Sequence, residues 1–422
     1  MWWRSSGPGI DGRSFRFPRL QRRCAHHPDL AQPPRGERSA VPGGLQPGHH
    51  GLRQGPGHAS VIGRKGNAMS RLVIDADGHI SEPAELWEEF CDPEFLAFAP
   101  RRVLDSQGRP RTFVGGEMAP YIPFDSEAYD KERPKGGVDP HARLADMDSE
   151  GMDISVIFPT TGLMFGGIAD AAVNNALCRA YNDWLRTYCD TNSSRMLGVA
   201  VVPQVDPALM VAEARRAIDD LGFVAVMLRP NVIADRTLDH PAYDGLWTLL
   251  AGRGVPAALH EGTTQNVPQS GLDRYDNFMF RHVCSHPHEQ QMGCLELIAG
   301  GVLERHPELR VVFLESGCGW APHWLERIDE HLDSWGHASA PLELSATEYF
   351  LRQCFISCDP EERTVPGVLD CLGDDCVVFA TDYPHPDGVF PGVVKALADR
   401  DDLSDSRKDK ILGLNAKRCF GL

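Results

Sequence analysis

The stretch Ile74-Asp75-Ala76-Asp77-Gly78-His79-Ile80 decides how the rest of the chain is interpreted. An apolar run that leads into carboxylates and an imidazole is typical of a buried strand with polar side chains at its carboxyl end. Asp77 and His79 are two residues apart, so on an extended chain they point to the same side and can hold a divalent metal together. The alternative is a strand-to-helix turn in which Asp75 or Ser81 caps a helix that starts after Pro83.

The composition is that of a soluble globular protein. The chain has 422 residues, of which 42% are hydrophobic and 24% charged, enough for one large domain or two medium ones. Residues 1–68 hold 11 basic and 3 acidic residues, net +8, which leaves 31 basic and 56 acidic residues, net −25, for the remainder. An acidic body argues against nucleic acid or an anionic membrane as a partner. No apolar run approaches the roughly 20 residues of a membrane helix.

The twelve cysteines are scattered and form no CxxC pair. Several lie in apolar runs, where a free thiol behaves as a small hydrophobic side chain. A chain of this size has no need of a disulfide framework, so we expect a reducing, cytoplasmic location.

Residues 1–68 contain 12 Gly and 8 Pro and show no apolar periodicity. A segment of this composition cannot bury a core, and we expect it to be disordered. Met69 stands just before the first expected strand, so an over-extended start of the sequence explains residues 1–68 better than a targeting peptide does.

The remainder, residues 69–422, alternates between short apolar runs and helical stretches. The runs are near-continuous, as expected of parallel strands buried on both faces. This pattern predicts an α/β protein with the (β/α)8 TIM-barrel fold; an open doubly wound sheet would show a Gly-rich loop after its first strand. Residues 91–140 form a long insertion after the first strand, either lid-like or disordered. The eight expected strands are 72–79, 154–159, 197–202, 223–228, 255–260, 309–315, 354–358 and 377–380.

In a barrel all strands open their carboxyl ends onto one face, where active sites lie. Two carboxylates and two imidazoles at such ends make a nitrogen and oxygen site suited to Zn²⁺ or Mn²⁺. Any one of them alone is also explained as a structural histidine or a helix cap. The polar residues expected on this face are Asp75, Asp77, His79, Arg229, His260, Glu261, Glu315, Asp382 and His385.

From about Leu72 to Leu422 the chain resembles the amidohydrolase-related family, the amidohydrolase-2 branch of the metal-dependent hydrolases. That branch includes aminocarboxymuconate-semialdehyde decarboxylase and the resorcylate decarboxylases. The resemblance is specific for the family and says little about the substrate. It rests on the motifs Asp75-Ala76-Asp77-Gly78-His79, Asp146–Asp153, Gly301–Pro307, Gly317–Pro322, Thr381-Asp382-Tyr383-Pro384-His385 and Asn415–Arg418.

The resemblance implies that Asp77, His79, His260 and Asp382 are ligands of one divalent metal. Many members have His where this chain has Asp77. Decarboxylases of the family often carry a His, their candidate proton donor, at the position of Glu315. The catalytic acid is therefore either Glu315 or His286, and we take Glu315, His286 and Asp382 as the candidate catalytic residues.

Three further residues have two interpretations each. His286 follows Ser285, a plausible N-cap, so it either serves the site or only begins a helix, whose positive end would lower its pKa. Arg229 either binds a substrate carboxylate bidentately or pairs with a core carboxylate. His385 is a candidate partner that orients a metal ligand.

The leading hypothesis is nonoxidative decarboxylation of a small, aromatic or enoic, carboxylic acid, with the metal as Lewis acid and a positioned acid that protonates carbon. The second is hydrolysis of an ester, lactone or amide by a metal-activated water, for which Glu315 suits the role of base. The third is a barrel that only binds a ligand. Small molecules are the expected partners, and the resemblance suggests a homodimer.

Overall fold

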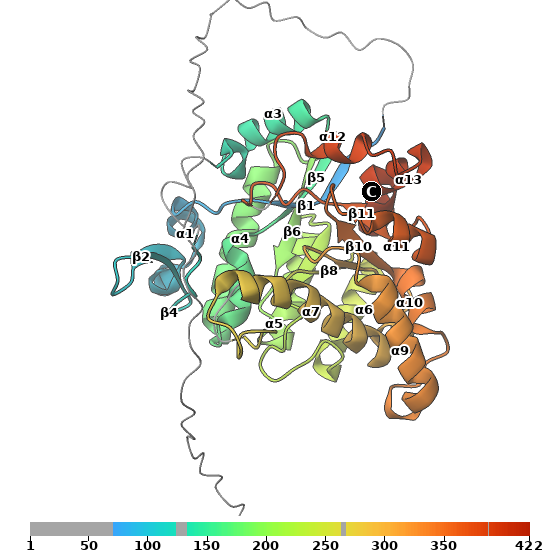
Figure 1. Ribbon diagram of the computed structural model, residues 1–422. Coiled ribbons are helices and arrows are strands. Elements are labelled where there is room, and N and C mark those ends of the chain that lie inside the picture. The colour runs from blue at the N-terminus through green and yellow to red at the C-terminus, as the bar shows by residue number, and fades with distance from the viewer. Residues whose placement is uncertain (1–70, 124–132, 263–266, 387) are drawn as a thin grey trace, which may run out of the picture. The chain divides into compact units, whose positions relative to one another are not determined.

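The computed structural model describes residues 71–123, 133–262, 267–386 and 388–422. Figure 1 shows strands at the centre of this part of the chain with helices around them. Eight strands form one sheet in the order β1-β5-β6-β7-β8-β9-β10-β11, and each neighbouring pair is parallel. They are β1 (Ile74–His79), β5 (Ile154–Phe158), β6 (Met196–Val201), β7 (Ala225–Leu228), β8 (Ala257–Leu259), β9 (Val311–Phe313), β10 (Cys354–Cys358) and β11 (Val377–Phe379).

Hydrogen bonds between the first strand and the segment after the last strand close the ring. The backbone N–H of His79 donates to the carbonyl of Tyr383 at 2.6 Å. The N–H of Asp382 donates to the carbonyl of Asp77 at 2.9 Å. The predicted barrel is thus confirmed, and the two ends of the ring meet at the residues that the sequence assigns to the site.

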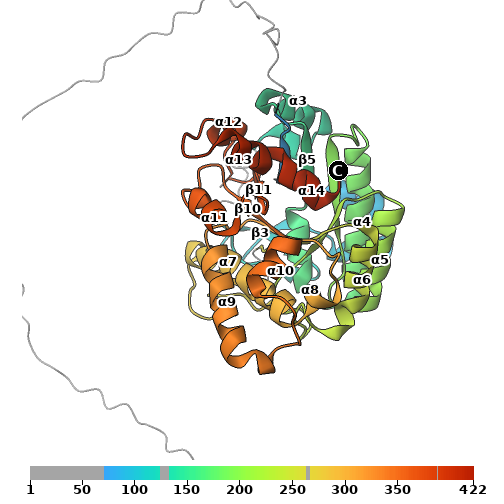
Figure 2. The same cartoon turned by 90° about the vertical axis from the view of Figure 1, so that its right-hand side faces the viewer.

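The core lies in and around the ring of strands. All residues of β7 to β11 are buried, as predicted from their near-continuous apolar runs. Helices cover the outside, and Figure 2 shows α4, α5 and α6 along one side of the strands. The helices outside the insertion and the segment 278–305 are α1 (Glu85–Phe90), α3 (Pro140–Glu150), α4 (Ala171–Cys189), α5 (Pro207–Asp219), α6 (Asp244–Arg253), α9 (Ala321–Trp335), α10 (Ala346–Gln353), α11 (Val365–Leu372), α12 (Val393–Ala398), α13 (Asp405–Asp409) and α14 (Asn415–Phe420).

Side-chain caps differ between the helices. Asp206 accepts from the backbone N–H groups at the start of α5, where Pro207 occupies the first turn. The alternative in which Asp75 or Ser81 caps the first helix is wrong, because α1 (Glu85–Phe90) has Ala84 at its N-cap and no side-chain cap. Asp75 instead accepts hydrogen bonds from the hydroxyls of Ser155 and Thr381, at 2.9 and 3.0 Å. Its carboxylate therefore ties β1 to β5 and β11.

Gly78 is the position of β1 where no side chain fits. A Cβ there would lie 2.4 Å from the guanidinium of Arg143 and from the carboxylate of Asp75, and 2.6 Å from the hydroxyl of Ser155. Arg143 uses that space to donate to the carbonyl of His79 at 2.9 Å. Glycine between Asp77 and His79 thus lets a buried arginine fix the strand that carries both side chains.

The insertion after β1 has more regular structure than the sequence predicts. Its described part, which follows α1, contains a 3-10 helix (Pro93–Phe98) and the antiparallel strands β2 (Arg101–Leu104), β3 (Pro110–Val114) and β4 (Glu117–Met118). The strands were not predicted because they are short and carry few apolar residues at alternating positions. The role of residues 91–140 as a lid stays a prediction.

The helix that would begin at His286 under one of its two interpretations starts earlier and is divided. The chain forms α7 (Phe278–Ala299), whose N-cap Asn277 accepts from the N–H of Phe280, and then α8 (Val302–Arg305). The interpretation of Ser285 as an N-cap is wrong, because Ser285 and His286 lie inside α7. Pro287 also lies in the interior of α7.

The disorder predicted for residues 1–68 lies outside the described residues. Among the described residues, no helix is both long and apolar enough to cross a membrane.

Candidate metal centre

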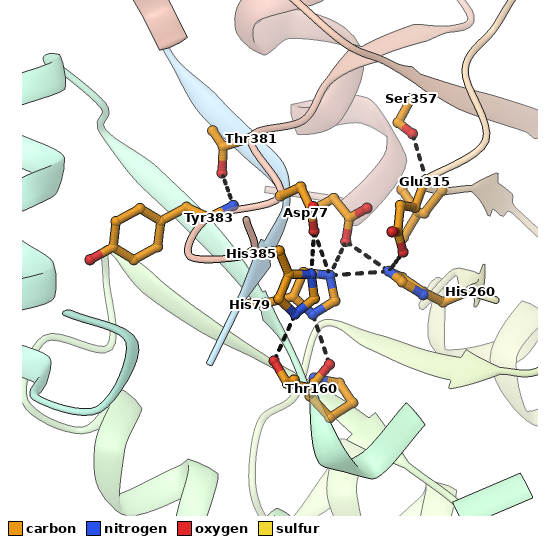
Figure 3. A network of polar contacts seen from close by, with 12 residues as sticks. Asp77, His79, Thr160, His260, Glu315, Ser357, Thr381, Tyr383 and His385 are labelled. Atoms are coloured by element: carbon orange, nitrogen blue, oxygen red, sulfur yellow. Dashed lines mark hydrogen bonds and ion pairs between the residues drawn. The ribbon is translucent and has the colours of Figure 1, made fainter. Parts of the chain in front are cut away.

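Four side chains meet at the carboxyl ends of β1, β8 and β11 (Figure 3). Nε2 of His79 lies 3.1 Å from Nε2 of His260, and Oδ1 of Asp77 lies 3.4 Å from both nitrogens. Oδ1 of Asp382 lies 3.4 Å from Nε2 of His79. A tetrahedral ion with bonds of about 2.0–2.1 Å holds its ligand atoms roughly 3.3–3.4 Å apart. The spacing of the atoms of Asp77, His79 and His260 matches that geometry, and Asp382 approaches this group on the side of His79.

The two imidazoles are oriented by backbone carbonyls. Nδ1 of His79 donates to the carbonyl of Pro159 at 2.7 Å, and Nδ1 of His260 donates to that of Glu261 at 2.6 Å. A carbonyl can only accept, so Nδ1 carries the proton in each ring. In the neutral tautomers both Nε2 lone pairs are therefore directed at the same point, the orientation that metal-binding histidines require.

The centre attracts positive charge. Both carboxylate oxygens of Asp77 are buried and have no hydrogen-bond partner among the described residues. Burial disfavours the charged form of His260, but Asp77 and Glu315 outweigh it and raise the pKa of His260 to about 9. An orphaned buried carboxylate among imidazoles is typical of a cation site. The residues present thus fit a divalent metal.

Asp382 is held by a histidine that sequence reasoning placed beside it. Its Oδ1 accepts from Nδ1 of His385 at 2.7 Å, and Nε2 of His385 contacts the hydroxyl of Thr160 at 2.9 Å. Burial, together with the nearby His79, lowers the pKa of His385 well below its ordinary value, so the ring is neutral. His385 stacks on His79 with ring centroids 4.1 Å apart and so contacts two candidate ligands.

Glu315 and Asp382 both have positive φ, 47° and 52°. For residues other than glycine this conformation is strained, and such residues cluster at functional sites. The backbone N–H of Glu315 donates to the hydroxyl of Ser357 at 3.2 Å, which fixes the turn after β9. Both strained residues direct carboxylates toward the imidazoles of the centre.

Glu315 lies between two histidines. Its Oε2 is 3.6 Å from Nε2 of His260, and its Oε1 is 3.6 Å from Nε2 of His286. Burial favours the neutral acid, but His286 and His260 outweigh it and hold the pKa of Glu315 well below its ordinary value. The same contact raises the pKa of His286 although burial opposes its charge. The expectation that a helix end lowers the pKa of His286 is therefore wrong.

Arg229 is buried and its donors face protein acceptors. It donates to Glu261 at 2.8 Å, to the carbonyl of Gly262 at 2.7 Å, to the carbonyl of Leu163 at 3.0 Å and to Asn231 at 3.0 Å. This is the geometry of the second interpretation, pairing with a core carboxylate. A role of Arg229 in substrate binding stays a prediction.

A cavity of about 470 Å³ opens above the centre. Its inner wall includes Glu315, His286 and His385, and its outer wall includes Trp87 of α1 and Arg102 of β2. The insertion and the strand ends therefore enclose one space, of a size suited to a small organic ligand.

Two neighbours of the site escaped sequence reasoning. Thr160 follows β5 and is an ordinary residue for a loop, so no pattern singled it out. His282 lines the cavity. It stands four residues before His286, and this spacing places two histidines on one helix face. That signal was missed because the helix was expected to begin only at His286.

Comparison with known proteins gives a consistent family. A 2-amino-3-carboxymuconate-6-semialdehyde decarboxylase of Dictyostelium discoideum is 26% identical over 67% of this chain and 77% of its own. A gamma-resorcylate decarboxylase of Rhizobium radiobacter is 27% identical over 66% and 86%. The crystal structure of a dihydroxybenzoic acid decarboxylase of a Polaromonas species, with bound manganese and 2-nitroresorcinol, has a TM-score of 0.62 at 19% identity, over 83% of this chain and 97% of its own.

The family model described as amidohydrolase matches residues 74–422, which include every strand of the ring and all four side chains of the centre. The resemblance found in the sequence motifs is thereby confirmed. The chain belongs to the amidohydrolase family.

Proposed function

We propose that the protein is a metal-dependent, nonoxidative decarboxylase of a small, aromatic or enoic, carboxylic acid. One observation carries the proposal: Nε2 of His79, Nε2 of His260 and Oδ1 of Asp77 lie 3.1–3.4 Å from one another, and Oδ1 of Asp382 lies 3.4 Å from Nε2 of His79. Glu315 and His286 stand beside this group as an acid–base pair. The decarboxylases among the relatives support it, because they belong to the same family.

The proposed ligands are Asp77, His79, His260 and Asp382. A divalent metal bound there supplies Lewis acidity toward the carboxylate or a neighbouring hydroxyl of the substrate. His385 holds the carboxylate of Asp382 in place by the hydrogen bond from Nδ1. We favour Zn²⁺ because imidazole nitrogens and carboxylate oxygens suit it; Mn²⁺ is the alternative, supported by the manganese in the Polaromonas enzyme.

The reaction needs one proton for each carbon dioxide released. The bond to the carboxylate breaks, its electron pair stays on the substrate carbon, and that carbon takes the proton. We assign the donor to Nε2 of His286, whose pKa is raised by Glu315. Glu315 stabilises the imidazolium until the proton moves.

A metal-dependent hydrolase of an ester, lactone or amide is the second candidate. It is favoured by the carboxylate of Glu315, whose lowered pKa makes it a base that accepts a proton from an attacking water.

We also place the protein in the reducing cytoplasm, because every cysteine in the described part of the chain is a free thiol. The homodimer stays a prediction that light scattering tests.

The test incubates the full chain with a panel of hydroxybenzoates and aryl esters and measures carbon dioxide and acid release separately. The decarboxylase proposal expects carbon dioxide from at least one acid. It also expects that His260→Ala and Asp382→Ala abolish turnover and lower the metal content, whereas His288→Ala, at an exposed position of α7, changes neither. Acid release alone favours the hydrolase, and full activity with full metal content in either variant contradicts the site.

A further inference from the structure

A second group of metal-ligating side chains lies on the cavity wall beside the first. His282 and His286 belong to α7, and Glu315 follows β9. Nε2 of His286 lies 3.6 Å and Nε2 of His282 lies 3.9 Å from Oε1 of Glu315. Two imidazole nitrogens and a carboxylate oxygen within this range make a three-ligand cluster, with none of the candidate ligands of the first centre in it.

The two histidines are arranged as a chelating pair. They stand four residues apart, so they project from the same face of α7, the spacing by which one helix supplies two ligands to zinc. Their rings stack with centroids 3.9 Å apart at an interplanar angle of 24°. Nδ1 of His286 faces the hydroxyl of Ser285 at 3.2 Å and the carbonyl of His282 at 3.3 Å. Nε2 is therefore the ring nitrogen that is directed at Glu315.

The carboxylate of Glu315 is divided between the two clusters. Its Oε2 faces His260 of the first centre at 3.6 Å, while its Oε1 faces His286 and His282. All three separations exceed the 2.7–3.2 Å of an ordinary hydrogen bond. They approach the roughly 3.3–3.4 Å between ligands of one tetrahedral ion. The positive φ of Glu315 and the hydrogen bond from its N–H to Ser357 hold the carboxylate at this position.

We propose that His282, His286 and Glu315 form a second site for a divalent cation, and that its occupation inhibits the enzyme. The inhibition rests on the proposed function, in which Nε2 of His286 delivers the proton. A cation bound at this nitrogen occupies the lone pair that the proton needs, and it also neutralises Glu315. Excess divalent metal then blocks turnover while the first centre keeps its ion. The cavity gives the cation access, because all three side chains line it.

The binding test titrates metal-free full-length protein with Co²⁺ and with Zn²⁺ and follows stoichiometry by calorimetry and by the visible bands of Co²⁺. We expect two equivalents per chain in the wild type, one in His282→Ala and two in His288→Ala, whose histidine is exposed on the same helix. The side chain of His282 is 29% exposed, so its removal leaves little unfilled space. Saturation of the wild type at one equivalent, or two equivalents in His282→Ala, overturns the proposal.

A second measurement does not depend on a variant. The two sites lie on either side of the Glu315 carboxylate, whose Oε2 is 3.6 Å from Nε2 of His260 and whose Oε1 is 3.6 Å from Nε2 of His286. Two Mn²⁺ ions this close interact through space, so the wild type loaded with excess Mn²⁺ is expected to show a spectrum broadened by dipolar coupling in electron paramagnetic resonance. A spectrum of isolated Mn²⁺ at every loading contradicts the site.

The consequence for turnover is measured as the ratio of rates with excess and with one equivalent of Zn²⁺. The rate with excess Zn²⁺ is expected to be at least tenfold lower than the rate with one equivalent in the wild type and in His288→Ala. In His282→Ala the two rates are expected to be nearly equal. Two bound ions without loss of turnover overturn the inhibitory role alone. Two bound ions in a protein that decarboxylates no acid overturn the proposed function and leave the second site in place.

Discussion

Asp77 is a buried carboxylate without a hydrogen-bond partner in the described chain, and its Oδ1 lies 3.4 Å from two imidazole nitrogens. Asp77→Asn keeps the shape of the side chain but removes the negative charge that the proposed ion requires. We expect metal affinity to fall by more than the roughly 10–100-fold typical of losing an outer partner of a ligand. Metal content after dialysis measures this, with Asp148→Asn, an exposed position on α3, as the control. Unchanged metal content in Asp77→Asn would exclude this residue as a ligand.

His286 allows proton delivery to be separated from metal binding. In the proposed reaction its Nε2 donates a proton to the substrate carbon. His286 is not one of the four candidate ligands of the first centre. His286→Gln is expected to lower kcat by about 10²–10⁴-fold, the usual contribution of a positioned acid. The first equivalent of metal is expected to bind as in the wild type. A variant with normal kcat would transfer the donor role to another group.

Residue types and strand ends made the first centre predictable. Asp77, His79, His260 and Asp382 each follow an apolar run, and the barrel brings those ends together whatever their separation in the chain. The role of Arg229 could not be predicted in the same way. Its position at a strand end suits both substrate binding and a core ion pair, and only the neighbouring Glu261, with the carbonyls of Leu163 and Gly262, distinguishes the two arrangements.

At the scale of elements, long apolar strands were predictable and helix starts were less so. Each strand is buried on both faces, so its hydrophobic run is determined by the fold. Helix α7 starts at the cap of Asn277, whose side chain accepts from the N–H of Phe280, and it continues through Pro287, a residue that is rare in a helix interior. The strands β2, β3 and β4 bury little, so their sequences carry no alternating pattern.

Helix α7 also carries a carboxylate with a pH-dependent cost. Burial raises the pKa of Glu296 to about 7 from its ordinary value of 4.5, even though its Oε2 accepts from the N–H of Leu238 at 2.9 Å. The folded state therefore holds this proton more tightly than the unfolded state. The contribution of Glu296 to the free energy of unfolding is fully present below pH 4.5 and is lost as the pH rises to 7. The free energy of unfolding falls by no more than about 1.4 kcal/mol per pH unit over this range.

Glu296→Gln removes that ionisation and keeps an oxygen for Leu238. We expect the variant to melt at a higher temperature than the wild type at pH 8 and at a similar one at pH 4.5. Melting curves at the two pH values measure this, and Glu308→Gln, at an exposed position, serves as the control. A variant that is equally destabilised at both pH values would show that packing, not charge, governs the position.

On the scale of the whole molecule, the family match and the ring both lie within residues 74–422. The described part of the chain from residue 71 onward therefore contains every group assigned to the site. We expect a protein that starts at Met69 to bind metal and turn over substrate as the full chain does. Parallel assays of the two lengths test this. Loss of metal or of turnover in the shorter protein would assign residues 1–68 a role in the enzyme.

The hydrogen bonds between β1 and the segment after β11 have a consequence for synthesis on the ribosome. Asp77 leaves the exit tunnel early, but its partners in the ring, Asp382 and Tyr383, emerge only near the end of translation. A nascent chain that has not reached these residues exposes an open edge of β1 and half of a metal site. Chaperones that bind unpaired strands during translation are thus expected to stay bound until the C-terminal residues of the chain have been synthesised.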